Sequence, residues 1–173
     1  MKKLLIVVDY QNDFVCGALG FAGAEKLDAG IAKRMDETRA QGGDVVFTFD
    51  THSENYAATQ EGKKLPIPHC MRGTKGHDLY GRTALAKRPY DRCFEKSTFG
   101  SLALADWLRG EDYSHIELAG LVSSICVLSN AILAKAALPE AEIIVDSRLV
   151  AGPDPLLHTK ALEVLRGVQV TIL

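Results

Sequence analysis

Short apolar runs alternate with amphipathic stretches along the whole chain, and this alternation limits the folds open to it. We expect strands near 3–9, 44–49, 90–95, 115–121, 141–146 and 168–172. We expect helices near 24–41, 101–109, 124–136 and 154–166, with a short one around 77–86. The pattern is typical of βαβ units, in which helices cover both faces of a buried parallel sheet. The sequence therefore predicts an α/β fold: a three-layer α-β-α arrangement around a mostly parallel, six-stranded, Rossmann-like sheet.

The length and composition fit one globular domain. The chain has 173 residues, of which 47% are hydrophobic and 24% charged, and both fractions are close to the average for soluble globular proteins. A chain of this length can bury most of its apolar side chains in one core. We therefore expect a single domain over residues 1–173.

Charge and hydropathy exclude two kinds of partner. The net charge is −2 and the basic residues form no stripe, so we expect neither nucleic acid nor a membrane surface to bind. The first apolar run ends at Asp9, which is too early for a secretion signal. No apolar run approaches the roughly 20 residues that span a bilayer. We therefore expect a cytoplasmic protein.

Cys126 has the most informative surroundings of any residue in the chain. The four cysteines form no CxxC pair, and a chain of this size needs no disulfides, so we expect reduced thiols. At Cys126 an apolar run gives way to Ser123-Ser124 and a helix begins. Because the positive end of a helix stabilises a thiolate, this position predicts a lowered thiol pKa and a nucleophile.

Asp9 and Lys96 also close strand-like runs. The carboxyl ends of parallel strands lie at one edge of a sheet, so both side chains would meet Cys126 there. The alternative for Asp9 is a helix or loop cap, and Lys96 taken alone is best explained as a solvated side chain. Together with a thiol they have a chemical logic, because the cation stabilises a thiolate and the carboxylate moves protons.

A long stretch without predicted regular structure runs from Asp50 to about Gly76. Asp50 and His52 leave a strand on the same side of the backbone, and a proline-stiffened segment before His69 could supply a third ligand. Two histidines with one or two carboxylates suit zinc, manganese or iron(II). The alternative is a pair of surface histidines in a loop, and spacing alone does not decide between the two. No role is assigned to the remaining histidines, whose surroundings in the sequence offer no partners: His77, His115 and His158.

Three segments resemble the motifs of the nicotinamidase and isochorismatase-like cysteine hydrolases, and the likeness spans nearly the whole chain. Residues 8–14, VDYQNDF, resemble the opening motif of that family, which carries its catalytic aspartate. Residues 96–99, KSTF, resemble the segment of its catalytic lysine, and residues 120–127, GLVSSICV, resemble its nucleophile motif. Three ordered motifs at suitable separations make a specific match, with the nicotinamidase branch as the first choice.

The resemblance implies a set of roles around the thiol. Asp9, Lys96 and Cys126 would be catalytic, and the backbone N–H groups of Val122 and Cys126 would form an oxyanion hole. A cis peptide between Leu121 and Val122 would orient the first of these donors. The implied reaction is hydrolysis of nicotinamide to nicotinate and ammonia through a thioester.

The resemblance also implies a metal site and a substrate pocket. Asp50, His52 and His69 match the metal ligands of nicotinamidases, and Glu61 is the natural candidate for a fourth ligand. The cofactor would be one divalent transition metal, with zinc favoured over manganese or iron. The partner would be a small amide substrate, and the family suggests a homo-oligomer.

Two departures from the family pattern bear on the substrate. Residues 65–68, LPIP, stand where many nicotinamidases have an aromatic residue beside the pyridine ring. Phe14 can still supply one stacking face, and Phe99 is a second candidate for contact with the substrate. Ser123-Ser124 replaces the usual Thr-Asp, and either serine can cap the following helix.

Other functions fit the same residues. The chain could act on a carbamoyl or ureido substrate, or could be a metal-free, isochorismatase-like vinyl ether hydrolase. It could also hydrolyse its substrate with a metal-bound water and no covalent step. Outside the enzymes, it could be a silent binding module that keeps only the fold.

Overall fold

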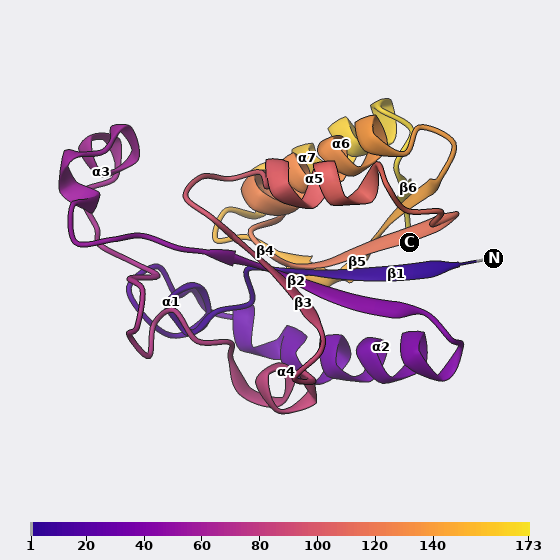
Figure 1. The fold of residues 1–173 in the computed structure, drawn as a ribbon. Coiled ribbons are helices and arrows are strands. Elements are labelled where there is room, and N and C mark those ends of the chain that lie inside the picture. Colours follow the sequence, from indigo (N-terminus) through magenta and orange to yellow (C-terminus); the bar gives the residue numbers. More distant parts are fainter. Residues whose placement is uncertain (1) are drawn as a thin grey trace.

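Six parallel strands form the centre of the protein in a computed structural model that describes residues 2–173 (Figure 1). The order across the sheet is β3-β2-β1-β4-β5-β6, and every neighbouring pair is parallel. The strands are β1 (Lys3–Val8), β2 (Asp44–Asp50), β3 (Arg92–Lys96), β4 (His115–Leu121), β5 (Glu142–Ala151) and β6 (Thr171–Ile172). The predicted parallel sheet is confirmed.

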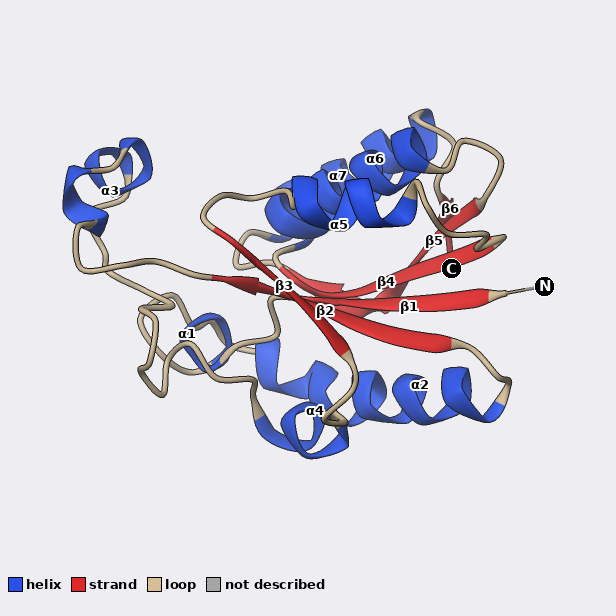
Figure 2. Ribbon diagram, viewed as in Figure 1, coloured by secondary structure: helices blue, strands red, loops and turns tan. Residues whose placement is uncertain are grey.

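Helices cover both faces of the sheet, which confirms the predicted three layers (Figure 2). One face carries α5 (Leu102–Leu108), α6 (Leu128–Ala137) and α7 (Pro155–Gly167). The other carries α2 (Asp28–Ala40) and α4 (Gly81–Ala86), with the short α1 (Asn12–Val15) beside them. Asp154 caps α7, since its Oδ1 accepts hydrogen bonds from the N–H groups of Leu156 and Leu157.

The central strand β1 shows why the first apolar run contains no polar interruption. Leu4 and Ile6 belong to the apolar cluster under α5, α6 and α7. Leu5 and Val7 alternate with them and belong to the cluster under α2. Because both faces are covered, every position of this strand after Lys3 is buried, as expected for a central parallel strand.

The segment from Asp50 to Gly76 contains more regular structure than the sequence suggests. It includes a 3₁₀ turn at Tyr56–Ala58 and the helix α3 (Gln60–Lys64), which projects from the body of the protein (Figure 1). Thr59 caps α3, because its Oγ1 accepts a hydrogen bond from the N–H of Gly62 at 3.0 Å. A single helical turn is too short to leave a periodic apolar pattern, so the prediction of an irregular loop was wrong here.

Several strand and helix ends also differ from prediction. β5 continues to Ala151, and β6 is confined to two residues. The helix expected from residue 24 begins as a 3₁₀ turn at Ala24–Leu27 before α2. None of the helices in residues 2–173 is long and apolar enough to cross a membrane.

The carboxyl ends of β1 to β4 meet at one edge of the sheet. Asp9 follows β1 directly, and Asp50 pairs in register with Lys96 at the ends of β2 and β3. On the other side of β1, the pairing of β4 with β5 shifts register between Leu118 and Gly120, and Gly120 has φ +117°. The fold therefore brings these strand ends together from widely separated parts of the sequence.

Gly120 allows the close approach of β4 to β1, and its replacement tests this packing. A Cβ at this position would lie 2.0 Å from the carbonyl oxygen of Val8, and the backbone conformation disfavours any side chain. We expect Gly120→Ala to lower the free energy of unfolding by about 3 kcal/mol in urea denaturation. Gly167→Ala is the control, because a Cβ there meets no atom within 4 Å, and it should raise stability by up to about 1 kcal/mol. Equal effects of the two substitutions would contradict this account of Gly120.

Candidate active site and metal centre

The side chains of Asp9, Lys96 and Cys126 lie together at the carboxyl edge of the sheet, as the sequence predicts. The Lys96 ammonium lies 2.6 Å from Oδ2 of Asp9 and 3.7 Å from Sγ of Cys126. All three residues are buried. The ammonium therefore contacts both the carboxylate and the thiol in a site with little access to water.

The two oxygens of the Asp9 carboxylate have different surroundings. Oδ1 accepts a hydrogen bond of 2.6 Å from the hydroxyl of Thr48, a residue that sequence analysis did not single out. Oδ2 forms a close ion pair with the Lys96 ammonium at 2.6 Å. The carboxylate is therefore fixed between a hydroxyl donor and a cation.

Burial and neighbouring charges have opposite effects on Asp9 and on Lys96. Burial raises the pKa of Asp9, and the positive charge of Lys96 offsets only part of this effect. Burial would lower the pKa of Lys96, but negative charge nearby, first that of Asp9, outweighs it and raises the pKa. Lys96 therefore remains an ammonium ion across the physiological pH range.

The thiol of Cys126 departs from the sequence-based expectation. Burial, followed by the negative charge of Asp9, raises its pKa well above the ordinary value, although Lys96 acts in the opposite direction. The prediction of a lowered pKa was wrong, because burial of the thiol, and then the carboxylate of Asp9, oppose ionisation. The residue lies in a π-helical turn, Ser123–Val127, that precedes α6. The site thus favours a protonated thiol with a carboxylate nearby to accept its proton.

The peptide between Leu121 and Val122 is cis, as the resemblance implied. It lies directly before the π-helical turn that carries Cys126. Val122 and Cys126, the two residues expected to form an oxyanion hole, therefore belong to one continuous turn at the end of β4.

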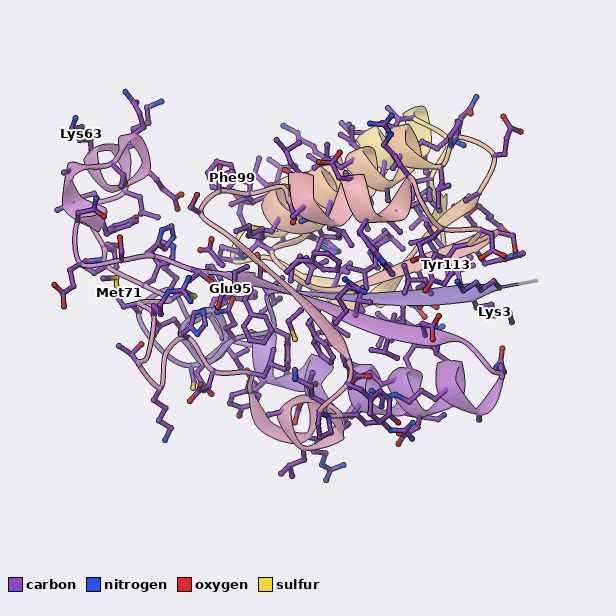
Figure 3. The ribbon with its side chains drawn as sticks, in the orientation of Figure 1. Lys3, Lys63, Met71, Glu95, Phe99 and Tyr113 are labelled. Atoms are coloured by element: carbon purple, nitrogen blue, oxygen red, sulfur yellow. The ribbon has the colours of Figure 1, made fainter. Side chains whose placement is uncertain are left out.

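A cleft of about 640 Å³ opens beside the buried site. Its lining includes His52 and Glu61 on one side and Phe99 and Ile125 on the other. Figure 3 shows Phe99 on the loop between β3 and α5, facing the projecting segment that carries α3. Phe14, the other aromatic candidate, is buried, and its ring centre lies 5.6 Å from that of His69. The two rings are thus placed at different depths near the same group of residues.

The four predicted metal ligands, Asp50, His52, Glu61 and His69, form one cluster. One ligand atom from each lies within 4.8 Å of all the others. Nε2 of His52 and Nε2 of His69 lie 3.0 and 3.2 Å from Oδ2 of Asp50. The same nitrogens lie 3.8 and 3.5 Å from Oε1 of Glu61. The structure therefore brings together the last residue of β2, a residue just after that strand, a residue of α3 and one from the segment before Met71.

The chemistry of this cluster fits a divalent metal. Nδ1 of His69 lies 2.8 Å from the carbonyl oxygen of Ile67, so it carries the proton and leaves the lone pair of Nε2 facing the cluster. Burial and the negative charge of Asp50 raise the pKa of Glu61, and a bound cation would relieve that repulsion. Two imidazoles and two carboxylates are a donor set that suits zinc.

Asp50 connects the cluster to the buried thiol site. Its Oδ1 lies 3.4 Å from the Lys96 ammonium, while its Oδ2 faces both histidines. Burial would raise the pKa of Asp50, but the contacts of its carboxylate with the imidazoles of His52 and His69, together with the charge of Lys96, lower it. The sequence indicated Asp50 as a metal ligand only, and its contact with Lys96 depends on the β2–β3 register.

Tyr56 is a further residue that sequence analysis missed. Its ring packs edge-on against His52 and His69, with centroid distances of 4.7 and 5.2 Å, and its hydroxyl donates to the carbonyl of Leu65 at 2.8 Å. It therefore packs against two of the candidate ligands and ties the ends of the projecting segment. Tyr56 lies in a region predicted to be irregular, so no strand or helix pattern placed it next to the candidate ligands.

The three remaining histidines contact residues from distant parts of the sequence. His77 lies 2.9 Å from Oγ1 of Thr51, and His115 pairs with Glu142. Nδ1 of His158 lies 2.9 Å from Oγ of Ser123. Ser123 therefore bonds across to α7, and neither serine of the motif caps the turn that follows. These contacts join elements that are distant in sequence, so local surroundings could not indicate them.

Comparison with known proteins gives consistent matches over the whole chain. The family model described as the isochorismatase domain matches residues 3–173. The uncharacterized isochorismatase family protein PncA of Bacillus subtilis is 32% identical over 147 residues, which cover 76% of this chain and 78% of that protein. The crystal structure of the nicotinamidase/pyrazinamidase PncA from Bacillus subtilis superposes with a TM-score of 0.88 at 30% identity, covering 99% of both chains. The structure of the pyrazinamidase of Pyrococcus horikoshii in complex with zinc gives a TM-score of 0.85 at 26% identity, covering 99% of this chain and 98% of that one.

The effect of Asp9 on the thiol can be tested by alkylation. Asp9→Asn removes the negative charge that raises the pKa of Cys126 and leaves the ammonium of Lys96 in place. We expect the rate of alkylation of Cys126 by iodoacetamide at pH 7, followed by peptide mass spectrometry, to rise by about tenfold or more. In the wild type the rate should increase as the pH is raised, because the thiol is protonated at neutral pH.

Lys96→Met is the matched control for this experiment. It removes the charge that lowers the pKa of Cys126, so alkylation at pH 7 should be slower than in the wild type. If Asp9→Asn left the rate unchanged, the carboxylate would not control the protonation of the thiol.

Proposed function

Because the chain belongs to the isochorismatase family, we propose that it is an amidohydrolase of the nicotinamidase type, which converts nicotinamide to nicotinate and ammonia through a thioester on Cys126. The observation that carries this proposal is the position of the Lys96 ammonium, 2.6 Å from Asp9 and 3.7 Å from Cys126. An acid–base group, a fixed cation and a thiol in contact are the parts that covalent amide hydrolysis needs.

The first half of the reaction forms the thioester. Asp9 accepts the proton of Cys126 through Oδ2, and Lys96 stabilises the resulting thiolate. The sulfur attacks the amide carbon, and the N–H groups of Val122 and Cys126 hold the oxyanion of the tetrahedral intermediate. Asp9 then delivers the proton to the amide nitrogen, so that ammonia leaves and the thioester remains.

The second half releases the acid. Asp9, again a carboxylate, takes a proton from water, and the hydroxide attacks the thioester carbon. The carbon–sulfur bond breaks, Asp9 returns its proton to the sulfur of Cys126, and the acid product leaves and loses its own proton to solvent. Lys96 keeps its charge throughout, which its raised pKa supports.

The substrate would lie between the cleft and the thiol. Asp50, His52, Glu61 and His69 would hold one divalent metal, zinc in preference to manganese or iron. When bound, it would supply a Lewis-acidic site for the ring nitrogen and so orient the carboxamide. Phe14 and Phe99 would contact the ring. The zinc complex of the Pyrococcus horikoshii pyrazinamidase supports the choice of metal.

We further propose that residues 1–173 act as one hydrolase domain in a cytoplasmic homo-oligomer with no nucleic-acid or membrane partner. The four cysteines are free thiols, which supports a reducing compartment. Exposed apolar side chains on α7, namely Leu156, Leu157 and Val164, support contact with a second copy.

Loss of the nucleophile should abolish turnover. We expect Cys126→Ala to reduce ammonia release from nicotinamide by at least about a thousandfold, because the variant lacks the sulfur that forms the thioester. Cys93→Ser, which changes an exposed thiol on β3, should leave the rate unchanged. Ammonia release by Cys126→Ala at the wild-type rate would favour direct attack by a metal-bound water.

The dependence of activity on metal distinguishes a nicotinamidase from a metal-free, isochorismatase-like hydrolase. We expect a chelator to remove zinc and most of the activity on nicotinamide and pyrazinamide, and added zinc to restore both. His52→Ala should lose zinc binding, whereas His115→Ala, which changes a histidine paired with Glu142, should keep it. Activity without metal, or faster turnover of a carbamoyl compound than of either pyridine or pyrazine amide, would contradict the proposed substrate.

A further inference from the structure

The end of β2 extends beyond its neighbour β1. The last register pair between the two strands is Val8 with Thr48, and the N–H of Asp9 still donates to the carbonyl of Thr48 at 3.2 Å. In a parallel ladder, the next hydrogen bond would run from the N–H of Asp50 to the carbonyl of Asp9. That bond is not formed, because Asp9 has φ +45° and its carbonyl accepts instead from the N–H of Gln11 at 2.8 Å.

The side chain of Gln11 takes the place of the missing strand. Its Oε1 accepts a hydrogen bond of 2.8 Å from the N–H of Asp50, and its Nε2 donates one of 2.9 Å to the carbonyl of the same residue. Nε2 also donates to the carbonyl of His77 at 2.8 Å. Gln11 is fully buried, so water cannot replace these contacts. The side-chain amide thus pairs with both backbone groups of Asp50, as a peptide of an adjacent strand would.

The residue held in this way has two functions at the site. Oδ2 of Asp50 faces His52 and His69 in the metal cluster, and Oδ1 faces the Lys96 ammonium. A shift of the Asp50 backbone would move both oxygens together. On its other side Asp50 has only the edge strand β3 as a neighbour, so Gln11 supplies the support from the centre of the sheet.

We propose that Gln11 is a positioning residue for the metal centre, acting through the backbone of Asp50. The inference rests on the metal site proposed above. The side-chain amide of Gln11 sets the affinity for the metal without contacting it, because it fixes the carboxylate of Asp50 toward the two histidines. Outer contacts of this kind change metal affinity by about ten- to a hundredfold in other proteins.

Zinc affinity, measured by competition with a chromophoric chelator on the intact protein, tests the claim. Gln11→Met keeps the length of the side chain and removes both hydrogen-bonding functions, and it should weaken zinc binding by about ten- to a hundredfold. Gln11→Asn keeps the amide but is one methylene too short to reach both backbone groups, and it should weaken binding similarly. Asn12→Ala is the matched control, because Asn12 is the adjacent amide and bonds to Lys75 and Leu79 instead. It should bind zinc within about twofold of the wild type.

A double-mutant cycle separates positioning from a general loss of structure. If Gln11 acts through Asp50, Gln11→Met should have little further effect on zinc affinity in an Asp50→Asn background. Equal losses in the two backgrounds would overturn the proposal, as would a folded Gln11→Met or Gln11→Asn protein with wild-type zinc affinity. A wild-type protein that binds no zinc would instead refute the proposed metal site, and this inference with it.

Discussion

The buried ammonium of Lys96 is the interaction on which the site depends. It lies between Asp9 and Asp50 and also contacts Cys126. Burying an isolated charge costs several kcal/mol, so an ammonium at this depth requires carboxylates in contact with it. The parallel sheet meets this requirement, because β1, β2 and β3 deliver one charged residue each to the same edge. The contacts of the Lys96 ammonium therefore depend on the register of the strands.

Sequence reasoning predicted the part of the site that follows from the ends of strands. Asp9 and Lys96 close strand-like runs and Cys126 follows one, and parallel strands place such residues together whatever their separation in sequence. The sequence also predicted the central strand β1, because a strand that is buried on both faces appears as a continuous apolar run. The same reasoning could not give the thiol its correct pKa direction, because that depends on the distance to Asp9 and on burial. It also missed Thr48, Tyr56 and Gln11, whose roles arise from contacts between segments far apart in the chain.

The structure also joins two sites that the sequence suggests separately. Asp50 belongs to the candidate metal cluster through one carboxylate oxygen and to the thiol site through the other. Gln11 lies two residues after Asp9 and holds the backbone of Asp50. The short segment after β1 therefore contributes to both sites at once, by a side-chain carboxylate in one case and a side-chain amide in the other.

The projecting segment around α3 is built separately from the sheet. Tyr56 and Leu65 are joined by a hydrogen bond across its base, and beyond that bond the segment contributes Glu61 and part of the cleft wall. None of its residues belongs to a strand of the sheet. A change in its length or side chains would therefore alter the cleft wall and the position of Glu61, and would leave the β2–β3 register and the contact between Lys96 and Cys126 in place.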